Sequence, residues 1–165
     1  MEQDPLPAGT RQPLARLSAG IAAVGFALSL VLAATQNPVI DPDFPQKLFV
    51  QVRDNPEPQR VLNAYNIAGP LLWFGGGPSH VTVGIDGRAD RYGAEYIERY
   101  QLDLIAARPD WEELFAELDP DSALLHDDDP LVEALVGTKG WVVVGDEGRW
   151  VLLHAPGAPG WTAAP

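Results

Sequence analysis

The chain has 165 residues and a formal net charge of −12, and it contains no cysteine. This length accommodates one ordinary domain with an anchor or tail, whereas two full domains would be crowded. The absence of cysteine excludes a disulfide scaffold, a cysteine-ligated zinc site and cysteine catalysis. The acidic balance argues against nucleic-acid binding, since neutralising phosphates requires clustered Lys and Arg. The whole net charge lies in residues 36–165, which hold 21 acidic and 9 basic side chains.

Residues 17–35 form an apolar segment without a single charged side chain. A helix of this length reaches roughly 28 Å, which matches the ~30 Å hydrocarbon core of a bilayer. Arg11 and Arg16 precede the segment, and Asp41 and Asp43 follow it. By the positive-inside rule, the N-terminus is cytoplasmic and residues 36–165 are extracytoplasmic. The pattern predicts a single-pass protein of the plasma membrane, with residues 1–16 as its cytoplasmic tail.

Two other interpretations of this segment stay open. A secretory signal peptide also has a basic start, an apolar middle and small residues near a cleavage site, which residues 31–35 could supply. The apolar stretch is longer than the usual 7–15 residues of such a peptide, which favours a retained membrane helix. A buried core helix is the third interpretation. The first two agree on an extracytoplasmic domain.

Residues 36–58 are expected to form a proline-marked stalk and a connecting helix, capped by Asp43. Strands are then predicted at 60–63, 81–85, 122–125, 141–144 and 150–153. A helical turn is predicted at 68–74, and helices are predicted at 93–106, 111–118 and 130–136. This alternation predicts an α/β domain over 59–155: a small, mainly parallel sheet with flanking helices and a C-terminal antiparallel hairpin. The Pro-, Gly- and Ala-rich residues 156–165 are expected to be disordered.

The most unusual segment is DGRADRYG at 86–93, which follows a predicted strand directly. Ligands of open α/β sheets bind beyond the carboxyl ends of the strands, so the position suits a site. Asp86 and Asp90 suit contacts to sugar hydroxyls or a divalent cation, and Arg88 suits a phosphate. The alternative is an Asp–Arg network that only braces the loop, because ion-pair networks cluster in the same way.

Two polar residues after the first strand are expected at the same edge of the sheet. Asn63 suits amide hydrogen bonds and Tyr65 suits stacking on a glycan or peptide, although both also suit plain turn chemistry. In the same way Arg91 offers a second phosphate contact and Tyr92 a second stacking surface. The candidate ligand-binding residues are therefore Asn63, Tyr65, Asp86, Arg88, Asp90, Arg91 and Tyr92.

His126 and the three aspartates after it offer a second cluster of metal-ligand types. Consecutive residues at a strand exit point in different directions, and negative charge at a helix N-terminus explains the aspartates more simply. We predict no metal site, no cofactor and no catalytic residue. A phosphate loop and a nucleophile elbow are both excluded, since their flanking residues are missing.

The chain resembles the C-terminal outer domain of actinobacterial polytopic membrane proteins that are glycosyltransferase-like, of the large-transmembrane type. These are related to protein mannosyltransferases and oligosaccharyltransferases. The resemblance covers about residues 38–155 and is carried by RVLN at 60–63, Tyr65, GPLLW at 69–73 and VGIDGRADRYG at 83–93. The chain departs from the family pattern at 67–70, where Ile-Ala-Gly-Pro replaces Trp-Gly-Gly-Tyr.

The resemblance implies a membrane-anchored accessory domain that is not catalytic alone, because the family places its catalytic acids in the membrane half. Its implied partners are the membrane, a polytopic membrane chain and a glycan or lipid-phosphate, with no nucleic acid. A first alternative is a subunit or truncated fragment of an active membrane glycosyltransferase. A second is a structural interaction module without a small-molecule site.

Overall fold

The computed structural model describes residues 24–29 and 43–161, which belong to two separate units, Met1–Asp41 and Pro42–Pro165. In the first unit the described residues 24–29 are helical. No helix within the described ranges has both the length and the apolar character needed to cross a bilayer. The predicted membrane span at 17–35 lies outside the described residues except for 24–29, and the predicted tail at 1–16 lies wholly outside them.

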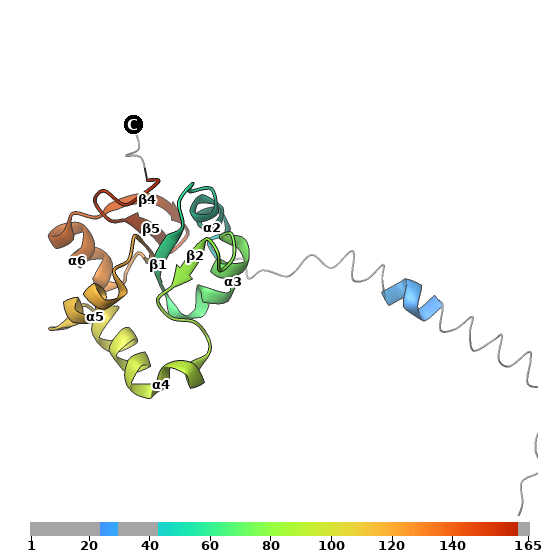
Figure 1. Cartoon of the computed structure of the whole chain (residues 1–165), viewed down its shortest axis with the longest axis horizontal. Helices are drawn as coiled ribbons and strands as arrows, with labels where there is room; N and C mark the ends of the chain where they lie inside the picture. Colours follow the sequence, from blue (N-terminus) through green and yellow to red (C-terminus); the bar gives the residue numbers. More distant parts are fainter. Residues whose placement is uncertain (1–23, 30–42, 162–165) are drawn as a thin grey trace, which may run out of the picture. The chain divides into compact units, whose positions relative to one another are not determined.

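The second unit is an α/β domain of five strands and flanking helices (Figure 1). Its elements in chain order are α2 (Gln46–Arg53), β1 (Gln59–Asn63), the 3-10 turn η1 (Tyr65–Ile67), α3 (Ala68–Phe74), β2 (Val81–Val83), α4 (Ala89–Glu98), the π-helix η2 (Arg99–Leu104), α5 (Trp111–Leu118), β3 (Ser122–His126), α6 (Pro130–Lys139), β4 (Val142–Glu147) and β5 (Trp150–His154).

The five strands form one sheet in the order β2-β1-β3-β5-β4. β1 pairs in parallel with both β2 and β3, whereas β5 is antiparallel to both β3 and β4. The α/β class with flanking helices and the C-terminal hairpin are therefore confirmed. The sheet is mixed rather than mainly parallel, because the hairpin inserts β5 between β3 and β4, and the second strand of a hairpin must run against the first.

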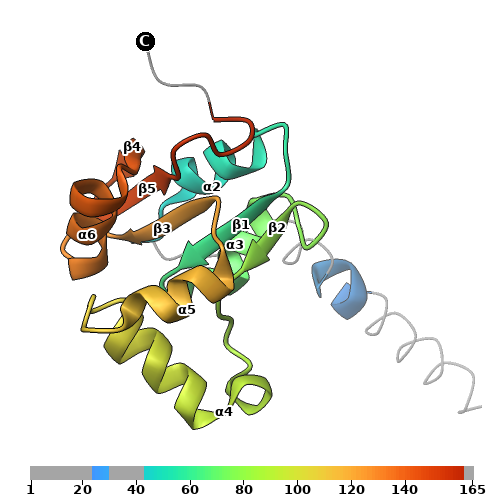
Figure 2. The same cartoon turned by 60° about the vertical axis from the view of Figure 1, so that its left-hand side comes forward.

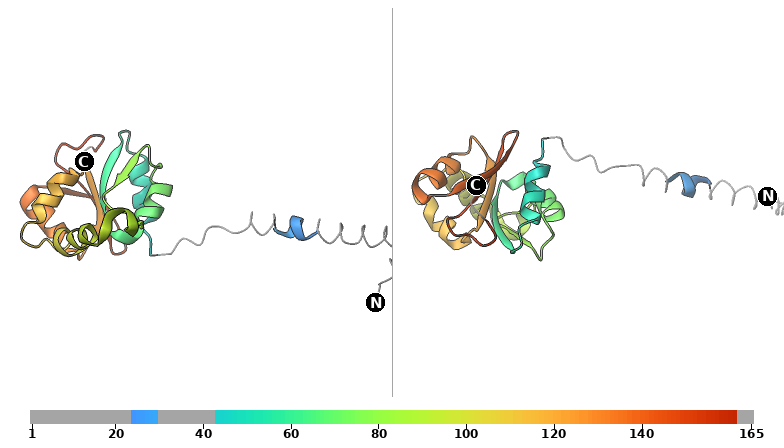
Figure 3. Two further views of the ribbon diagram at one scale, coloured as in Figure 1. Left: turned by 60° about the horizontal axis from the view of Figure 1, so that its bottom comes forward. Right: turned by 90° about the horizontal axis from the view of Figure 1, so that it is seen from above.

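Helices cover both faces of the sheet, with α2 and α3 on one face and α4, α5 and α6 on the other (Figure 3). Neighbouring residues of a strand point to opposite faces. Val61 accordingly belongs to the core cluster under α2 and α3, and Leu62 belongs to the cluster under η2, α5 and α6. This explains why the strands read as nearly continuous apolar runs.

Two helices differ from the sequence prediction at their N-terminal ends. α2 begins at Gln46 with Pro45 at its N-cap, so Asp43 does not cap it. The helix predicted over 93–106 begins earlier, at Ala89, and is interrupted at Gly93, whose φ of 75° and ψ of 160° are not helical. Beyond the interruption the helix passes into η2, which carries the fully buried Tyr100.

The residues after β5 pack against the domain as far as Trp161. Trp161 stacks on His154 with ring centroids 5.9 Å apart, and its Nε1–H donates to Gln59 Oε1 at 2.7 Å. The side-chain amides of Gln59 and Asn55 both donate to the carbonyl of Pro159. Residues 156–161, for which composition predicts disorder, thus make side-chain-specific contacts, and 162–165 lie outside the described residues.

Candidate functional site at the carboxyl edge of the sheet

The parallel strands β1, β2 and β3 end at the same edge of the sheet, and α4 lies beyond the ends of β1 and β2 (Figure 2). β1 connects to β2 on one side and the chain then crosses to β3 on the other. Ligands of open α/β sheets bind at such a reversal of strand order. This edge carries Asn63 and Tyr65 after β1 and the DGRADRYG segment after β2.

The ladder between β1 and β2 opens at this edge, and two tyrosines occupy the opening. The last ladder bond runs from the N–H of Gly84 to the carbonyl of Val61 at 3.1 Å. In a continued parallel ladder the N–H of Asn63 would bond the carbonyl of Gly84. Instead, Asn63 N–H donates to the hydroxyl of Tyr100 at 3.1 Å, and the hydroxyl of Tyr96 donates to the Gly84 carbonyl at 2.8 Å.

The side chain of Asn63 closes the same opening from the strand side. Its Nδ2 donates to the carbonyls of Ala64 and Ile85 at 2.8 and 2.9 Å. Its Oδ1 accepts from the N–H groups of Gly84 and Ile85. Both ends of the amide are thus occupied and the residue is completely buried, so Asn63 fixes the start of the loop rather than facing solvent.

Three tyrosines spaced four residues apart in the sequence connect this opening to the loop. Tyr92 stacks on Tyr96 with centroids 5.2 Å apart, and Tyr96 lies 6.1 Å from Tyr100. Burial raises the pKa of Tyr96 and raises that of Tyr100 far above its ordinary value. Both hydroxyls therefore keep their protons at neutral pH. The resulting polar and aromatic column holds α4 and η2 to the ends of β1 and β2.

Asp86 is buried, and its carboxylate is occupied by Arg88. The Arg88 backbone N–H donates to Oδ1 at 2.9 Å, and its guanidinium Nε donates to Oδ2 at 2.9 Å, with a further bond from Nη2. This guanidinium lowers the pKa of Asp86 to about 2, with smaller contributions from the Arg88 N–H and the Tyr92 hydroxyl. The Asp86–Arg88 pair therefore braces the loop from within.

The remaining loop residues face solvent. Asp90 and Arg91 are exposed in the first turn of α4, and Arg88 keeps 61% of its side chain exposed although it is paired. Seven of the nine described Lys and Arg side chains form ion pairs with carboxylates. Within the described part of the chain, Lys47 and Arg91 are the two that form none. Arg91 thus offers an exposed guanidinium that forms no ion pair with the described residues, next to the equally exposed Asp90.

The structure gathers the seven predicted residues along one edge but divides them by exposure. Asn63 and Asp86 are buried, while Arg88, Asp90 and Arg91 are exposed. The half-buried rings of Tyr65 and Tyr92 both pack against the core cluster under η2, α5 and α6. The surface available to a ligand consists of Arg88, Asp90, Arg91 and the outer part of Tyr92.

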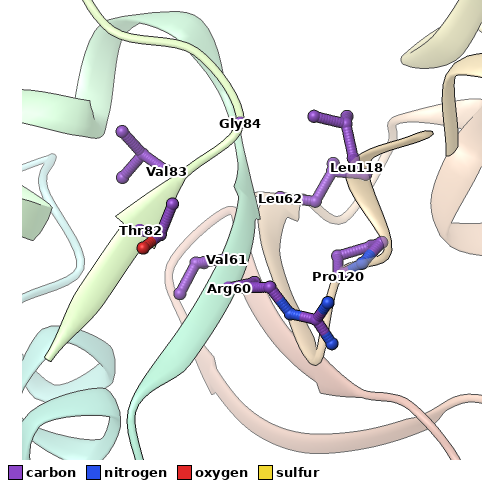
Figure 4. Close-up of a pocket in the computed structure, with 8 residues that line it drawn as sticks. All are labelled: Arg60, Val61, Leu62, Thr82, Val83, Gly84, Leu118 and Pro120. Atoms are coloured by element: carbon purple, nitrogen blue, oxygen red, sulfur yellow. The ribbon is translucent and has the colours of Figure 1, made fainter. Parts of the chain in front are cut away.

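A small pocket lies between β1, β2 and the residues that follow α5 (Figure 4). Its volume is about 70 Å³, well below the roughly 300 Å³ of the smaller ligand sites. Arg60, which lines it, already binds Asp121 at 2.8 Å and also Asp119. The pocket is therefore too small for a sugar. Its one cationic side chain, Arg60, is already held in ion pairs with two aspartates.

His126, Asp128 and Asp129 place their ligand-type atoms within 4.8 Å of one another, the one such group in the described ranges. Asp129 Oδ2 accepts the His126 backbone N–H at 2.9 Å, and Asp128 lies 3.6 Å from Arg149. These contacts close the turn before α6. The cluster is thereby explained as turn structure.

Sequence reasoning missed the structural part of this edge. Tyr96 and Tyr100 lie in a helix predicted from apolar spacing, and no sequence pattern points to Gly84, where an added Cβ would lie 2.8 Å from the Tyr100 hydroxyl. A four-residue spacing places Tyr96 and Tyr100 on one face of a helix, whereas the interruption at Gly93 separates Tyr92 from that helix. No family model, no curated protein and no solved structure matches this chain.

Proposed function

We propose that this chain is a membrane-anchored protein whose α/β domain lies outside the plasma membrane and binds a phosphate-bearing glycolipid through the edge loop 84–92. In this role it serves as an accessory domain and is not catalytic alone. The apolar segment 17–35 and the charge asymmetry around it support the anchoring. The resemblance of segments 60–73 and 83–93 to glycosyltransferase-like outer domains supports the ligand class.

The observation that carries the proposal is the exposed Arg91, which has no ion pair in the described residues and lies in the same loop as the exposed Arg88. The guanidinium of Arg91 faces solvent, so it is accessible to an incoming anion. Arginine suits phosphate in particular, because its planar guanidinium donates two parallel hydrogen bonds. Tyr92, one residue further on, is half-buried, and its ring stacks on Tyr96.

The rigidity of the loop supports the same role. Asp86 fixes Arg88 from within the loop, and the hydroxyl of Tyr96 fixes the loop's first carbonyl. A preformed loop loses little conformational entropy on binding, which raises affinity. The ion pair of Asp86 with Arg88 and the hydrogen bond from Tyr96 therefore hold in place the loop that carries the exposed arginines.

Titration of the full chain in nanodiscs with a short-chain polyprenyl phosphate tests the binding. We expect saturable binding that Arg91→Gln weakens at least tenfold, that free polyprenol does not reproduce, and that Lys47→Gln leaves unchanged. Lys47 is the matched control, since among the described residues it is the other cation without an ion pair, and it lies on α2. Equal loss in both variants, or no binding by the wild type, would overturn the ligand assignment.

The topology is tested separately. Because the chain has no cysteine, single cysteines can be labelled without background. In intact cells a membrane-impermeant maleimide is expected to label Ser79→Cys, which is exposed between α3 and β2, and to label Thr10→Cys only after lysis. Labelling of Thr10→Cys but not Ser79→Cys in intact cells would reverse the proposed orientation.

The structural interaction module remains the second candidate, and one observation favours it. The Asp86 carboxylate is saturated by Arg88 and so is withdrawn from any ligand. If the titration shows no binding while Asp86→Asn destabilises the domain, this second function stands in place of the first.

A further inference from the structure

The domain presents one conspicuously uncharged surface, formed by α3 and the loop that follows it. Residues 61–85 contain no Asp, Glu, Lys or Arg, although the rest of the domain is rich in acids. Within this stretch Trp73 is 81% exposed, the most exposed large apolar side chain of the described domain. Burying a tryptophan removes apolar surface from water, so a contact made at this position would be stabilising.

The packing of α3 holds Trp73 outward. Leu71 is completely buried under the helix, and Phe74 stacks on Phe49 of α2 with centroids 6.3 Å apart. With these two side chains fixed inward, the geometry of a helix turns Trp73 toward solvent, while Leu72 is half-buried against the core. Trp73 is thus presented to solvent from α3.

The tether to the predicted membrane span joins the domain in the same layer. α2 lies on the same face of the sheet as α3, and the chain enters α2 just after Asp43, whose carbonyl accepts the Trp150 Nε1–H at 2.6 Å. Eight residue steps separate position 35 from Asp43, and a fully extended chain of this length spans at most about 29 Å. The layer of α2 and α3 therefore remains within reach of the bilayer surface.

We infer that Trp73 is an interfacial anchor that inserts into the headgroup region of the bilayer and orients the domain on it. This inference rests on the proposed membrane anchoring. Tryptophan is the side chain enriched at this depth, because its ring is apolar and its N–H still finds a partner. The absence of charge over 61–85 avoids the repulsion that the acidic remainder of the domain would meet at lipid phosphates. A bilayer fits a single exposed Trp better than a protein partner, which would need a larger apolar patch.

Quenching of tryptophan fluorescence by brominated lipid tests this. The full chain is reconstituted in phosphatidylcholine vesicles whose acyl chains carry bromine near the headgroup. The chain has five tryptophans. We therefore expect the brominated lipids to lower the fluorescence intensity of the wild type by at most the contribution of one of them. We expect Trp73→Phe to lose that quenching and Trp111→Phe, which alters a half-buried ring on the opposite helical layer, to keep it.

Vesicle flotation distinguishes a failure of the proposed membrane anchoring from a failure of the role assigned to Trp73. If the chain floats with the vesicles and the wild type and Trp73→Phe are quenched alike, the anchoring stands and the interfacial role of Trp73 is overturned. If Trp73 is protected from acrylamide but not quenched by brominated lipid, a protein surface covers it and the inference is again overturned. If the chain does not float, the proposed anchoring fails and this inference fails with it.

Discussion

The hydroxyl of Tyr100 bonds both backbone groups of Asn63, accepting from its N–H at 3.1 Å and donating to its carbonyl at 2.8 Å. Both residues are completely buried. One side chain from the π-helix η2 thereby takes the place of a strand neighbour at the end of β1. This contact connects the sheet to the helical segment that carries the candidate site.

Replacing Tyr100 by Phe tests how much this contact contributes. The variant keeps the ring but leaves the N–H of Asn63 buried without a partner, which costs roughly 1–3 kcal/mol of unfolding free energy. Urea denaturation monitored by circular dichroism measures the difference. Tyr65→Phe is the control, because its half-buried hydroxyl has no hydrogen-bond partner among the described residues; an equal loss in both variants would contradict the role assigned to Tyr100.

Gly93 interrupts α4 in a conformation that side chains exclude. Its φ of 75° with ψ of 160° lies in a region reached almost only by glycine. Gly93→Ala is expected to lower the unfolding free energy by about 1–3 kcal/mol and to loosen the loop before it. Gly87→Ala is the matched control, since Gly87 has open space around its Cβ position and no positive φ; its unfolding curve should overlay that of the wild type.

The pH dependence of stability should report the Asp86–Arg88 pair. The Arg88 guanidinium lowers the pKa of Asp86 to about 2 in the fold, from an ordinary 3.8. A lowered folded-state pKa means that the stabilisation is complete above about pH 4 and is lost as the pH falls toward 2. Asp86→Asn and Arg88→Gln should both remove this part of the acid-induced loss, as measured by chemical denaturation between pH 6 and pH 2.

A double-mutant cycle tests whether Asp86 and Arg88 affect the pH dependence through their contact with each other. If the pair accounts for the effect, the double variant Asp86→Asn with Arg88→Gln should lose no more pH dependence than either single variant, because the contact is already broken. An additive loss would show that the two residues act through other partners.

Local sequence patterns predicted the helices correctly where residues that interrupt a helix lie directly at both of its ends. The helical turn predicted at 68–74 and the helix predicted at 111–118 have the bounds of α3 and α5, since each is flanked by residues that interrupt a helix. The position of the candidate loop also follows from its place after a strand. The predicted site residues therefore lie along one edge, as expected from the parallel pairing of β1, β2 and β3.

What the sequence could not supply depends on contacts between distant segments. The insertion of β5 between β3 and β4 is a matter of sheet order, on which strand periodicity is silent. The burial of Asn63 follows from the tyrosines that meet it from another element, 37 residues away in the case of Tyr100. In a sequence, a polar residue that binds a ligand at a strand end cannot be told from one that binds backbone groups of the same chain.

The C-terminal segment provides the last prediction. Trp161 Nε1–H donates to the side-chain oxygen Oε1 of Gln59, a residue of β1 that is only 1% exposed. Trp161→Ala leaves that oxygen buried without its donor and removes the stacking on His154, so we expect a loss of roughly 1–3 kcal/mol of unfolding free energy. Trp73→Ala removes an indole of the same size from an exposed position and should leave stability within about 0.5 kcal/mol of the wild type. The unfolding free energies of both variants, measured by denaturant titration, show whether Trp161 stabilises the fold and Trp73 does not. A loss in Trp73→Ala as large as in Trp161→Ala would mean that this distinction is wrong.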